Sequence, residues 1–582
     1  MTGLLVPSLI LVPWLGALVV WRVGDSRPKW QHGLAVSFSV LAGIVSLILI
    51  PQASSDVAFS LPMGKLFGEL TFIADGLSVA LAAIACVVGS LAVLFAVDYM
   101  HGEHQLGRFY TFVLLFIGAM TGLVLTSNLL FLFFFWEITA LCSYALISFY
   151  NDDPKAVAGG MKALIITQFG GVGLLAGALT VFGTLGTYQI PDLLARFSEL
   201  TPNLLAVMGF GFLLAAAAKS AQFPFHTWLP DAMEAPTPIS ALIHAATMVN
   251  AGVYLLARFY PVFEHVPGWT FAVMLVGMIS ALITAVMALT AMDLKRALAY
   301  STVSQLGYMV YAIGAGGIFA SQFHLLSHAV FKALLFLAAG SVIHSAGTRD
   351  MRRMGGLGKQ MPFVRNVFIL GALALAGLPI MNGFWSKELI LEEGLLHTPL
   401  WAHIGMLIGA GLTAFYTLRM TWMVFFGEPR EALHAHDAGT AMKVSLGILA
   451  VGSLTTWLLA GPFSSLLERT LPFHEFHVLT LDTLAEEIFL APATYIALGV
   501  VALGLAISWM VRKQATGPVP AALEALSRES FGLDWLNQQV VKLMSQSASA
   551  MQKTQTGEMN WNVVGIIGAL VVVLGILLWS AS

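Results

Sequence analysis

Long apolar runs alternate with short polar loops along almost the whole chain, from Leu4 to Trp579. Runs of roughly 17–25 apolar residues are long enough to cross a bilayer as helices, and the chain holds about sixteen of them. Their approximate cores are 3–22, 33–50, 76–97, 110–126, 128–149, 161–184, 205–226, 239–259, 270–291, 297–317, 321–344, 363–395 (interrupted), 402–426, 442–461, 491–511 and 561–580. The pattern predicts an all-α polytopic membrane protein.

Composition supports this class and narrows the chemistry. Of the 582 residues, 58% are hydrophobic and 10% are charged, whereas a soluble protein carries about 25% charged residues. The net charge of −3 does not indicate nucleic-acid binding. The two cysteines, Cys86 and Cys142, lie in apolar runs and are too few for a zinc site or an iron–sulfur cluster. We therefore expect no cofactor in this chain and a lipid bilayer around it.

Basic residues gather in the short loops that follow odd-numbered predicted helices. These loops hold Arg22, Arg27, Lys29, Lys155, Lys295, Arg296, Arg349, Arg352, Arg353, Lys359, Arg512 and Lys513. Because cytoplasmic loops carry the excess of Lys and Arg, we expect these loops on the cytoplasmic side and both termini on the other.

Two ionisable residues lie within apolar runs, Glu137 in the fifth predicted helix and Lys219 in the seventh. A charge at the bilayer centre costs at least ~2.5–3.5 kcal/mol, so such residues usually mark a proton or ion pathway. Burial disfavours the charged form of each, and a neighbouring opposite charge restores it. If the two side chains meet, opening of a Glu137–Lys219 pair would let the lysine release a proton.

Two predicted helices contain breaks, and each break lies close to a lysine. Pro224 follows Lys219, while Pro379 and Gly383 precede Lys387. Proline removes a backbone donor and glycine loosens the helix. Paired breaks in two halves of a chain are typical of transporters, although prolines also kink helices for packing alone. The nearby lysines favour the functional interpretation.

The eleventh predicted helix carries three titratable groups on one face. His324, His328 and Lys332 are spaced at i, i+4 and i+8, a rise of ~12 Å. Together with intervening water they would pass protons. His244 stands alone in the eighth predicted helix and is a further candidate. Gly170, Gly171 and Gly173 lack the context of a dinucleotide fingerprint and predict close helix approach instead.

The segment Ala521–Gln555 is too polar to span a membrane. It contains no proline and a single glycine, Gly532, and its apolar residues fall partly on one helix face. We expect an amphipathic helix of ~35 residues and ~52 Å that lies along the membrane surface or a partner.

Several motifs resemble one known family. They are Asp75-Gly-Leu-Ser78, Trp136-Glu137, Leu141-Cys-Ser-Tyr144, Lys219–Pro230, Ala235–His244, Asp293–Ser301, Ser304–Gly307, His324–Phe336 and Gly383–Glu388. The chain resembles the antiporter-like large subunits of respiratory complex I, membrane hydrogenases and Mrp-type cation/proton antiporters. Its ending looks like chain L of bacterial complex I. Two features depart from that chain: Gly171 stands where chain L typically has an aspartate, and the loop 347–356 looks Mrp-like.

The resemblance implies two inverted five-helix repeats, 110–260 and 270–427. Residues 1–109 would precede them, and 428–511, 512–560 and 561–582 would form further membrane helices, the lateral helix and a final anchor. It also implies a Glu137/Lys219 pair, Lys332 at the centre and Lys387 as the terminal lysine, with Glu388 beside it.

The implied function is ion translocation, with protons favoured over Na⁺, in a complex I-like NADH:quinone oxidoreductase of a prokaryotic inner membrane. Neighbouring membrane subunits would be direct partners, and peripheral redox subunits indirect ones that carry the electrons. An Mrp-type antiporter and an energy-coupled inorganic-carbon uptake system remain alternatives.

Overall fold

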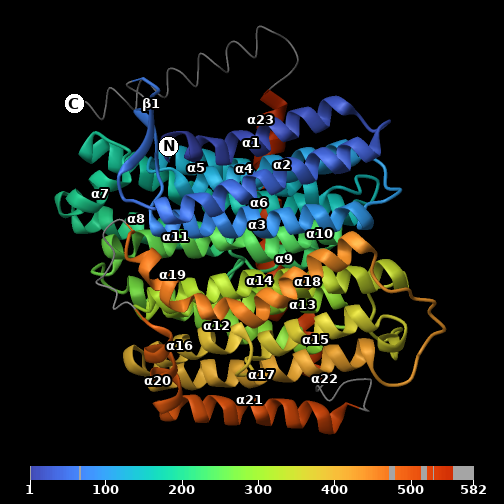
Figure 1. The fold of residues 1–582 in the computed structure, drawn as a ribbon. Coiled ribbons are helices and arrows are strands. Elements are labelled where there is room, and N and C mark those ends of the chain that lie inside the picture. Colours follow the sequence, from blue (N-terminus) through green and yellow to red (C-terminus); the bar gives the residue numbers. More distant parts are fainter. Residues whose placement is uncertain (1, 65–66, 471–478, 513–520, 529, 555–582) are drawn as a thin grey trace.

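The computed structural model describes residues 2–64, 67–470, 479–512, 521–528 and 530–554, which form a bundle of roughly parallel and antiparallel helices (Figure 1). Within these residues, thirteen helices are long and apolar enough to cross a membrane. The predicted spans 297–317 and 363–395 correspond to α13 and to the broken pair α15/α16. These helices are not among the thirteen, because they are too short or not apolar enough. The predicted helix 561–580 lies outside the described residues. The all-α multi-pass class is confirmed, while the number sixteen stays a prediction.

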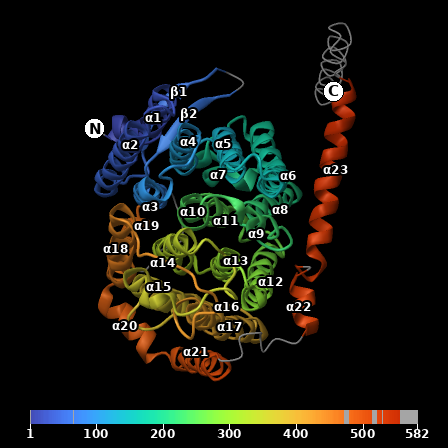
Figure 2. The same cartoon turned by 90° about the vertical axis from the view of Figure 1, so that its right-hand side faces the viewer.

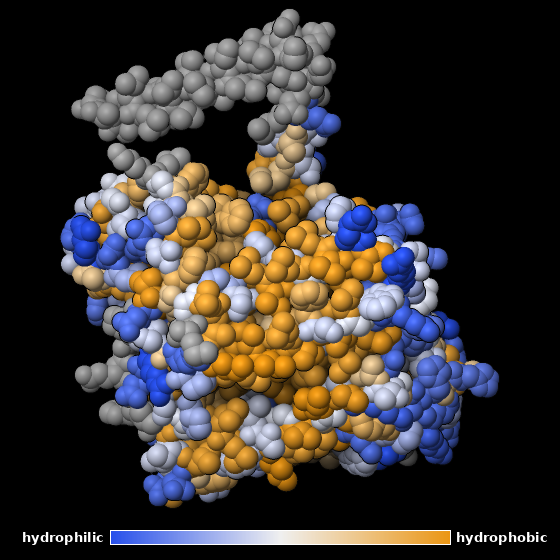
Figure 3. Space-filling view, turned by 45° about the horizontal axis from the view of Figure 1, so that its top comes forward, coloured by the Kyte–Doolittle hydropathy of each residue, from blue (hydrophilic) through white to orange (hydrophobic). Residues whose placement is uncertain are grey.

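An apolar surface covers the middle of one face of the bundle. Figure 3 shows a broad hydrophobic band on one face, with hydrophilic residues gathered towards the ends of the helices. By contrast, the span Thr237–Phe263 is wholly buried, so it lies at the centre of the bundle. A hydrocarbon environment outside and a protein interior inside explain both observations.

The elements of the first half begin with two helices and a hairpin. They are α1 (Thr2–Val23), α2 (Pro28–Leu49), β1 (Val57–Pro62), β2 (Glu69–Ile73), α3 (Gly76–Tyr99), α4 (Leu106–Leu125), α5 (Leu129–Ile147), α6 (Pro154–Leu185), α7 (Ile190–Arg196) and α8 (Pro202–Lys219). The antiparallel hairpin, with Leu61 opposite Leu70, is an exception to the all-α prediction. Its second strand leads to Asp75, which caps α3 by accepting a hydrogen bond from the Ser78 amide at 2.9 Å.

The central elements differ from the prediction at one point. They are α9 (Trp228–Asp231), α10 (Thr237–Ala241), α11 (Met248–Phe263), α12 (Trp269–Thr290), α13 (Leu294–Gly314), α14 (Ile318–Ala346), α15 (Pro362–Ala376), α16 (Asn382–His397) and α17 (Leu400–Phe425). The eighth predicted helix is not one α-helix, because a π-helical turn at Leu242–Ala246 separates α10 from α11. Such turns occur often at functional sites.

Both predicted breaks are confirmed. Helix α8 ends at Lys219 and does not continue to 226, and α9 begins only at Trp228. Helix α15 ends at Ala376, followed by Gly377 with a φ of +83°, and α16 begins at Asn382. The first break is buried or half-buried throughout, whereas the second reaches the surface at Ile380, which is 73% exposed.

Glycines bring α6 and α8 into contact, as predicted. A Cβ at Gly173 would lie 2.3 Å from the Gly211 carbonyl oxygen, and one at Gly170 would lie 2.4 Å from the Ala218 Cβ. Real Cβ atoms do not approach so closely, so these positions need glycine. The tight contact fixes Lys219, the last residue of α8, against the helices that carry Glu137 and Gly171.

The C-terminal elements include the predicted lateral segment, but in two pieces. They are α18 (Thr440–Thr455), α19 (Ala460–Leu467), α20 (Leu481–Leu490), α21 (Pro492–Val511), α22 (Ala521–Arg528) and α23 (Leu533–Thr554). A single helix over 521–555 is therefore wrong. Ser530, Phe531 and Gly532 all have positive φ, which an α-helix cannot accommodate. With its 22 residues, α23 has a length of ~33 Å.

Helices α22 and α23 lie along one side of the bundle and cross the direction of its helices (Figure 2). Asp534 forms an ion pair with Lys162 of α6 at 2.8 Å. The Asn537 side chain donates to the Pro224 carbonyl at 2.8 Å, within the break after Lys219. The hydroxyls of Ser527 and Thr290 are 2.6 Å apart. The segment is thus fastened to the bundle at three points and touches one of the two helix breaks.

Candidate functional site

Lys219 is completely buried at the end of α8, and its ammonium group is held by the backbone of α5. The Nζ atom donates a hydrogen bond to the Trp136 carbonyl at 2.7 Å and lies 4.9 Å from the centre of the Trp136 ring. The carbonyl and the ring face both stabilise a positive charge. A lysine in this position can hold a proton without a carboxylate in contact.

Glu137 is the residue after Trp136, yet it forms no direct ion pair with Lys219. Its carboxylate oxygens are buried, and the two charges interact electrostatically across a gap. The carboxylate faces Gln168 and Gly171 of α6, and a Cβ at Gly171 would lie 2.6 Å from Glu137 Oε1. The structure therefore places the two charges near each other without contact, and the glycine makes room for the carboxylate.

Lys387 has the corresponding position at the second break. It is buried on α16, and its Nζ donates to the Leu375 carbonyl at 2.9 Å. This carbonyl is in the last turn of α15, where helix carbonyls lack partners and the helix dipole favours a cation. The ammonium group also lies 5.7 Å from the ring centre of Tyr308 on α13. Glu388, 6% exposed, faces Thr494 of α21.

Lys332 is buried in the middle of α14 and bonds to α13. Its Nζ donates to the Leu298 carbonyl at 3.3 Å and to the Ser301 hydroxyl. All three predicted lysines, Lys219, Lys332 and Lys387, therefore donate to a backbone carbonyl. A carbonyl anchors an ammonium group but cannot accept its proton, so the proton stays free to leave through water.

The histidines on α14 have different surroundings. His324 Nε2 lies 3.2 Å from the Gln305 amide oxygen, and Nδ1 lies 2.9 Å from the Ser386 hydroxyl. Because the amide oxygen only accepts, Nε2 carries the hydrogen and Nδ1 is the acceptor. The imidazole thus links α13, α14 and α16. His328 is buried, and neither of its ring nitrogens has a partner among the described residues.

His244 lies on the π-helical turn between α10 and α11. It is completely buried, and both ring nitrogens lack partners among the described residues. Its ring centre is 4.9 Å from that of Phe336 on α14. The structure thus places His244 beside the helix that carries Lys332, and its free nitrogens can exchange a proton with water.

Helix α13 connects these groups in the second half of the chain. Leu298, Ser301, Gln305 and Tyr308 recur every three or four residues, so they share one face. Leu298 and Ser301 accept hydrogen bonds from Lys332. Further along the same face, Gln305 bonds to His324 and the Tyr308 ring lies beside the Lys387 ammonium group. The sequence alone does not reveal this row, because serine, glutamine and tyrosine are uncharged and common in helices.

A buried ion pair was also missed. Arg258 of α11 donates two hydrogen bonds to Asp75, one of them at 2.8 Å, and another to Ser78 at 2.7 Å. Both charged side chains are almost fully buried. An arginine at the end of a predicted span was the available signal. The pair fastens the start of α3 to α11, and it accounts for the Asp75–Ser78 motif.

Residues 126–413 match the family model described as NADH:quinone oxidoreductase/Mrp antiporter, TM. Residues 61–110 match that described as NADH-Ubiquinone oxidoreductase (complex I), chain 5 N-terminus. NADH-quinone oxidoreductase subunit L of Mycobacterium tuberculosis is 35% identical over 98% of this chain and 97% of its own length. NAD(P)H-quinone oxidoreductase chain 5 of a Picosynechococcus species is 41% identical over 79% of this chain and 76% of its own.

Two solved structures share the fold. The Mrp complex from Dietzia sp. DQ12-45-1b aligns with a TM-score of 0.79 and 28% identity over 98% of this chain and 62% of the matched chain. The archaeal membrane-bound sulfane sulfur reductase aligns with a TM-score of 0.71 and 26% identity. The alignment covers 79% of this chain and 96% of the matched chain. The chain belongs to the antiporter-like membrane subunits of the NADH:quinone oxidoreductase and Mrp antiporter family. Within it, full-length similarity is to subunit L.

Proposed function

We propose that this chain translocates protons across a membrane as a subunit of a complex I-like NADH:quinone oxidoreductase. The observation that carries the proposal is the row of buried lysines, each anchored to a carbonyl and not neutralised by a carboxylate in contact. Buried charges without a paired ion are costly, and a protein that only needed stability would replace them with apolar residues.

In this mechanism Glu137 and Lys219 control the first half of the path. A shift of Glu137 towards Lys219 stabilises the protonated amine, and separation favours release of its proton into water. Lys332, His328 and His324 receive and pass the proton, and Lys387 with Glu388 releases it. His324 suits transfer because its two nitrogens already face two different hydrogen-bonding groups.

Protons fit this row better than Na⁺. Sodium needs several oxygen ligands, whereas a chain of amines and imidazoles exchanges hydrogens and repels a bare cation. No group of three or more His, Cys, Asp or Glu side chains within the described ranges is arranged to hold a metal ion. Electron transfer is assigned to peripheral partner subunits, and this chain is assigned no cofactor.

The proposed setting is the inner membrane of a prokaryote, within an array of related subunits. Leu526, Trp535 and Leu543 on α22 and α23 are 51%, 65% and 64% exposed. An apolar helix face of this kind suits packing against neighbouring membrane subunits. We also propose that 110–260 and 270–427 are inverted repeats, since each contains a helix broken beside a buried lysine.

An Mrp-type cation/proton antiporter is the second candidate, because the Mrp complex structure matches 98% of this chain. One experiment distinguishes the proton pump from the antiporter. Membranes that hold the complex are given NADH and a quinone, and acidification is followed with and without Na⁺. Redox-driven acidification that needs no Na⁺ supports the proposed function. Exchange of Na⁺ for H⁺ down an imposed gradient, without any electron donor, supports the antiporter.

A further inference from the structure

The described residues contain a fourth buried lysine that the path above does not use. Lys295 is 3% exposed in the first turn of α13, and its Nζ donates to the Ala235 carbonyl at 2.6 Å. Its sequence position had suggested a basic loop residue. It shares the chemistry of Lys219, Lys332 and Lys387: an enclosed ammonium group held by a backbone carbonyl. We propose, building on the proposed function, that Lys295 carries protons from the adjacent aqueous face to Lys332.

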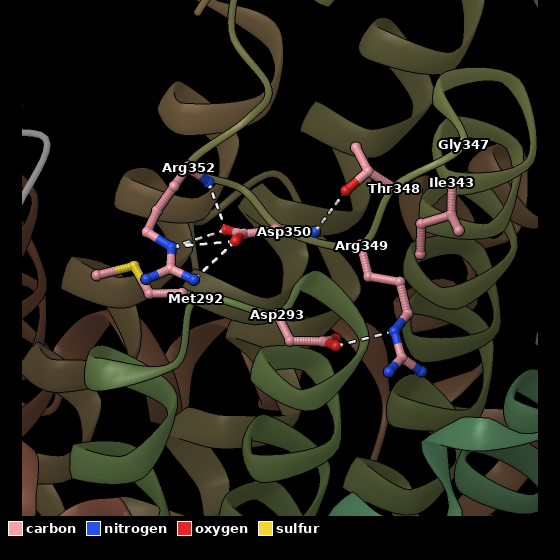
Figure 4. Close-up of a pocket in the computed structure, with 8 residues that line it drawn as sticks. All are labelled: Met292, Asp293, Ile343, Gly347, Thr348, Arg349, Asp350 and Arg352. Carbon is pink, nitrogen blue, oxygen red and sulfur yellow. Dashed lines mark hydrogen bonds and ion pairs between the residues drawn. The ribbon is translucent and has the colours of Figure 1, made fainter. Parts of the chain in front are cut away.

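A pocket at the surface of the bundle is lined in part by Asp293 and Arg349, which interact electrostatically with Lys295. The pocket has a volume of about 470 Å³ and is lined by loop residues that include Asp293, Arg349 and Asp350 (Figure 4). Arg349 forms ion pairs with Asp293 at 3.0 Å and with Glu234 at 2.9 Å. Arg352, at 2.7 Å, holds the pKa of Asp350 below its usual range by a side-chain hydrogen bond. The pocket is thus lined by charged side chains, and it is the vestibule of the proposed path.

Glu234 and Asp293 bring negative charge to the Lys295 end of this vestibule. Glu234 directly precedes the residue whose carbonyl holds Lys295, and Asp293 caps α13 two residues before it. Arg349 bridges both carboxylates, so it separates the vestibule from the buried amine. A carboxylate freed from Arg349 would have a proton-accepting oxygen beside the lysine.

From Lys295, the proposed path leads towards Lys332. The Leu298 carbonyl that accepts from Lys332 is three residues further along α13, a rise of ~4.5 Å. Ser240 and His244 lie on the segment that follows Ala235, are at most 1% exposed, and have unpartnered polar atoms within the described structure. His244 interacts electrostatically with both Lys295 and Lys332. Buried polar groups without protein partners are typically bonded to water, which would complete the connection.

The test uses the assembled complex with Lys295→Gln and Lys295→Met. Glutamine retains an N–H donor for the Ala235 carbonyl but cannot titrate, whereas methionine keeps only the shape. If Lys295 carries protons, both variants assemble normally, and protons moved per electron fall to the level of Lys332→Ala. Lys155→Gln, which removes an exposed lysine, is the control and keeps wild-type transport.

A purely structural lysine gives a different pattern. Lys295→Gln would then pump like the wild type while Lys295→Met would lose assembly, and wild-type pumping by Lys295→Gln overturns the inference. If Lys295→Gln pumps normally while Lys332→Ala does not pump, the entry path through Lys295 is rejected but the proposed function is not. Normal pumping by Lys332→Ala rejects the proposed function itself.

Discussion

The two halves of the chain bury their lysines in similar ways but connect them differently. In the first half, Lys219 is held by the Trp136 carbonyl, and Glu137 stands apart without an ion pair. In the second half, α13 joins Lys332, His324 and Lys387 through one face of a single helix. Under the proposed function, the first half is a switch whose charge pair opens and closes. The second half is then a relay of fixed neighbouring groups.

Loss of Lys332 should have the largest effect, because no other amine lies at the centre of the relay. Without it, an excess proton at this depth faces a cost of at least about 2.5 kcal/mol, or a roughly 70-fold slower crossing. Proton pumping by Lys332→Ala in proteoliposomes, with NADH oxidation measured in parallel, checks this. Unchanged pumping in a fully assembled complex would contradict the relay.

Replacement of Glu137 should disable the switch without removing the relay. We expect Glu137→Gln to slow pumping roughly tenfold, which corresponds to about 1.4 kcal/mol of lost attraction in the transfer step. Glu199→Gln is the control, since that glutamate is 51% exposed in a surface ion pair. Equal pumping rates for the two variants would leave Glu137 without a role.

The histidines should matter less than Lys332, since water can replace one imidazole in a hydrated chain. His324→Ala and His328→Ala should each slow pumping by less than about tenfold. His324→Ala should be the more harmful, because it also separates Gln305 from Ser386. Rates for both single variants give the order, and a more harmful His328→Ala would show that the links to α13 and α16 are unimportant.

Gly171 offers a way to disturb the switch alone. A methyl group there would lie 2.6 Å from Glu137 Oε1, so Gly171→Ala should displace the carboxylate and slow pumping a few-fold. Gly183→Ala on the same helix has no atom within 4 Å of the added Cβ and should pump normally. Its gain in helix propensity, roughly 0.5–1 kcal/mol, should not affect transport. Similar pumping in both variants would argue against a special space at Gly171.

The smallest effect should come from the lateral segment. Asn537→Ala removes the hydrogen bond to Pro224, a loss of about 0.5–1.5 kcal/mol, and should loosen α23 while transport declines slightly. Gln538→Ala, at an exposed neighbouring position, is the control. Hydrogen exchange in α23 and native gels measure the loosening. Equal exchange in both variants would mean that Asn537 does not hold the helix.

Patterns of hydrophobicity and misplaced charge were enough to predict the class, the two breaks and the buried candidates. Lys219, Lys332 and Lys387 stand out because a charge in an apolar run is rare. The α13 row could not be predicted, because Ser301 and Gln305 look like ordinary helix residues until their partners are known. Lys295 was misread for the opposite reason: it is near the end of a run, where a lysine usually meets water.

Local geometry caused the remaining errors. The left-handed backbone at Ser530–Gly532 interrupts the lateral helix, and one glycine in a long polar segment does not predict such a turn. The π-helical turn at Leu242–Ala246 was likewise not predicted, because no proline or glycine within that stretch marks it. The hairpin β1–β2 was missed although Glu69-Leu-Thr-Phe72 alternates polar and apolar residues, which is the period of a strand.

The central claim is that the switch and the relay are coupled, so that neither moves protons when the other is disabled. The direct measurement is the number of protons moved per electron in assembled complexes with Lys219→Ala, with Lys332→Ala and with both substitutions together. Coupled transport predicts that each single variant loses the same number of protons per electron as the double variant. A double variant that loses about the sum of the two single losses would show two independent paths and contradict the account.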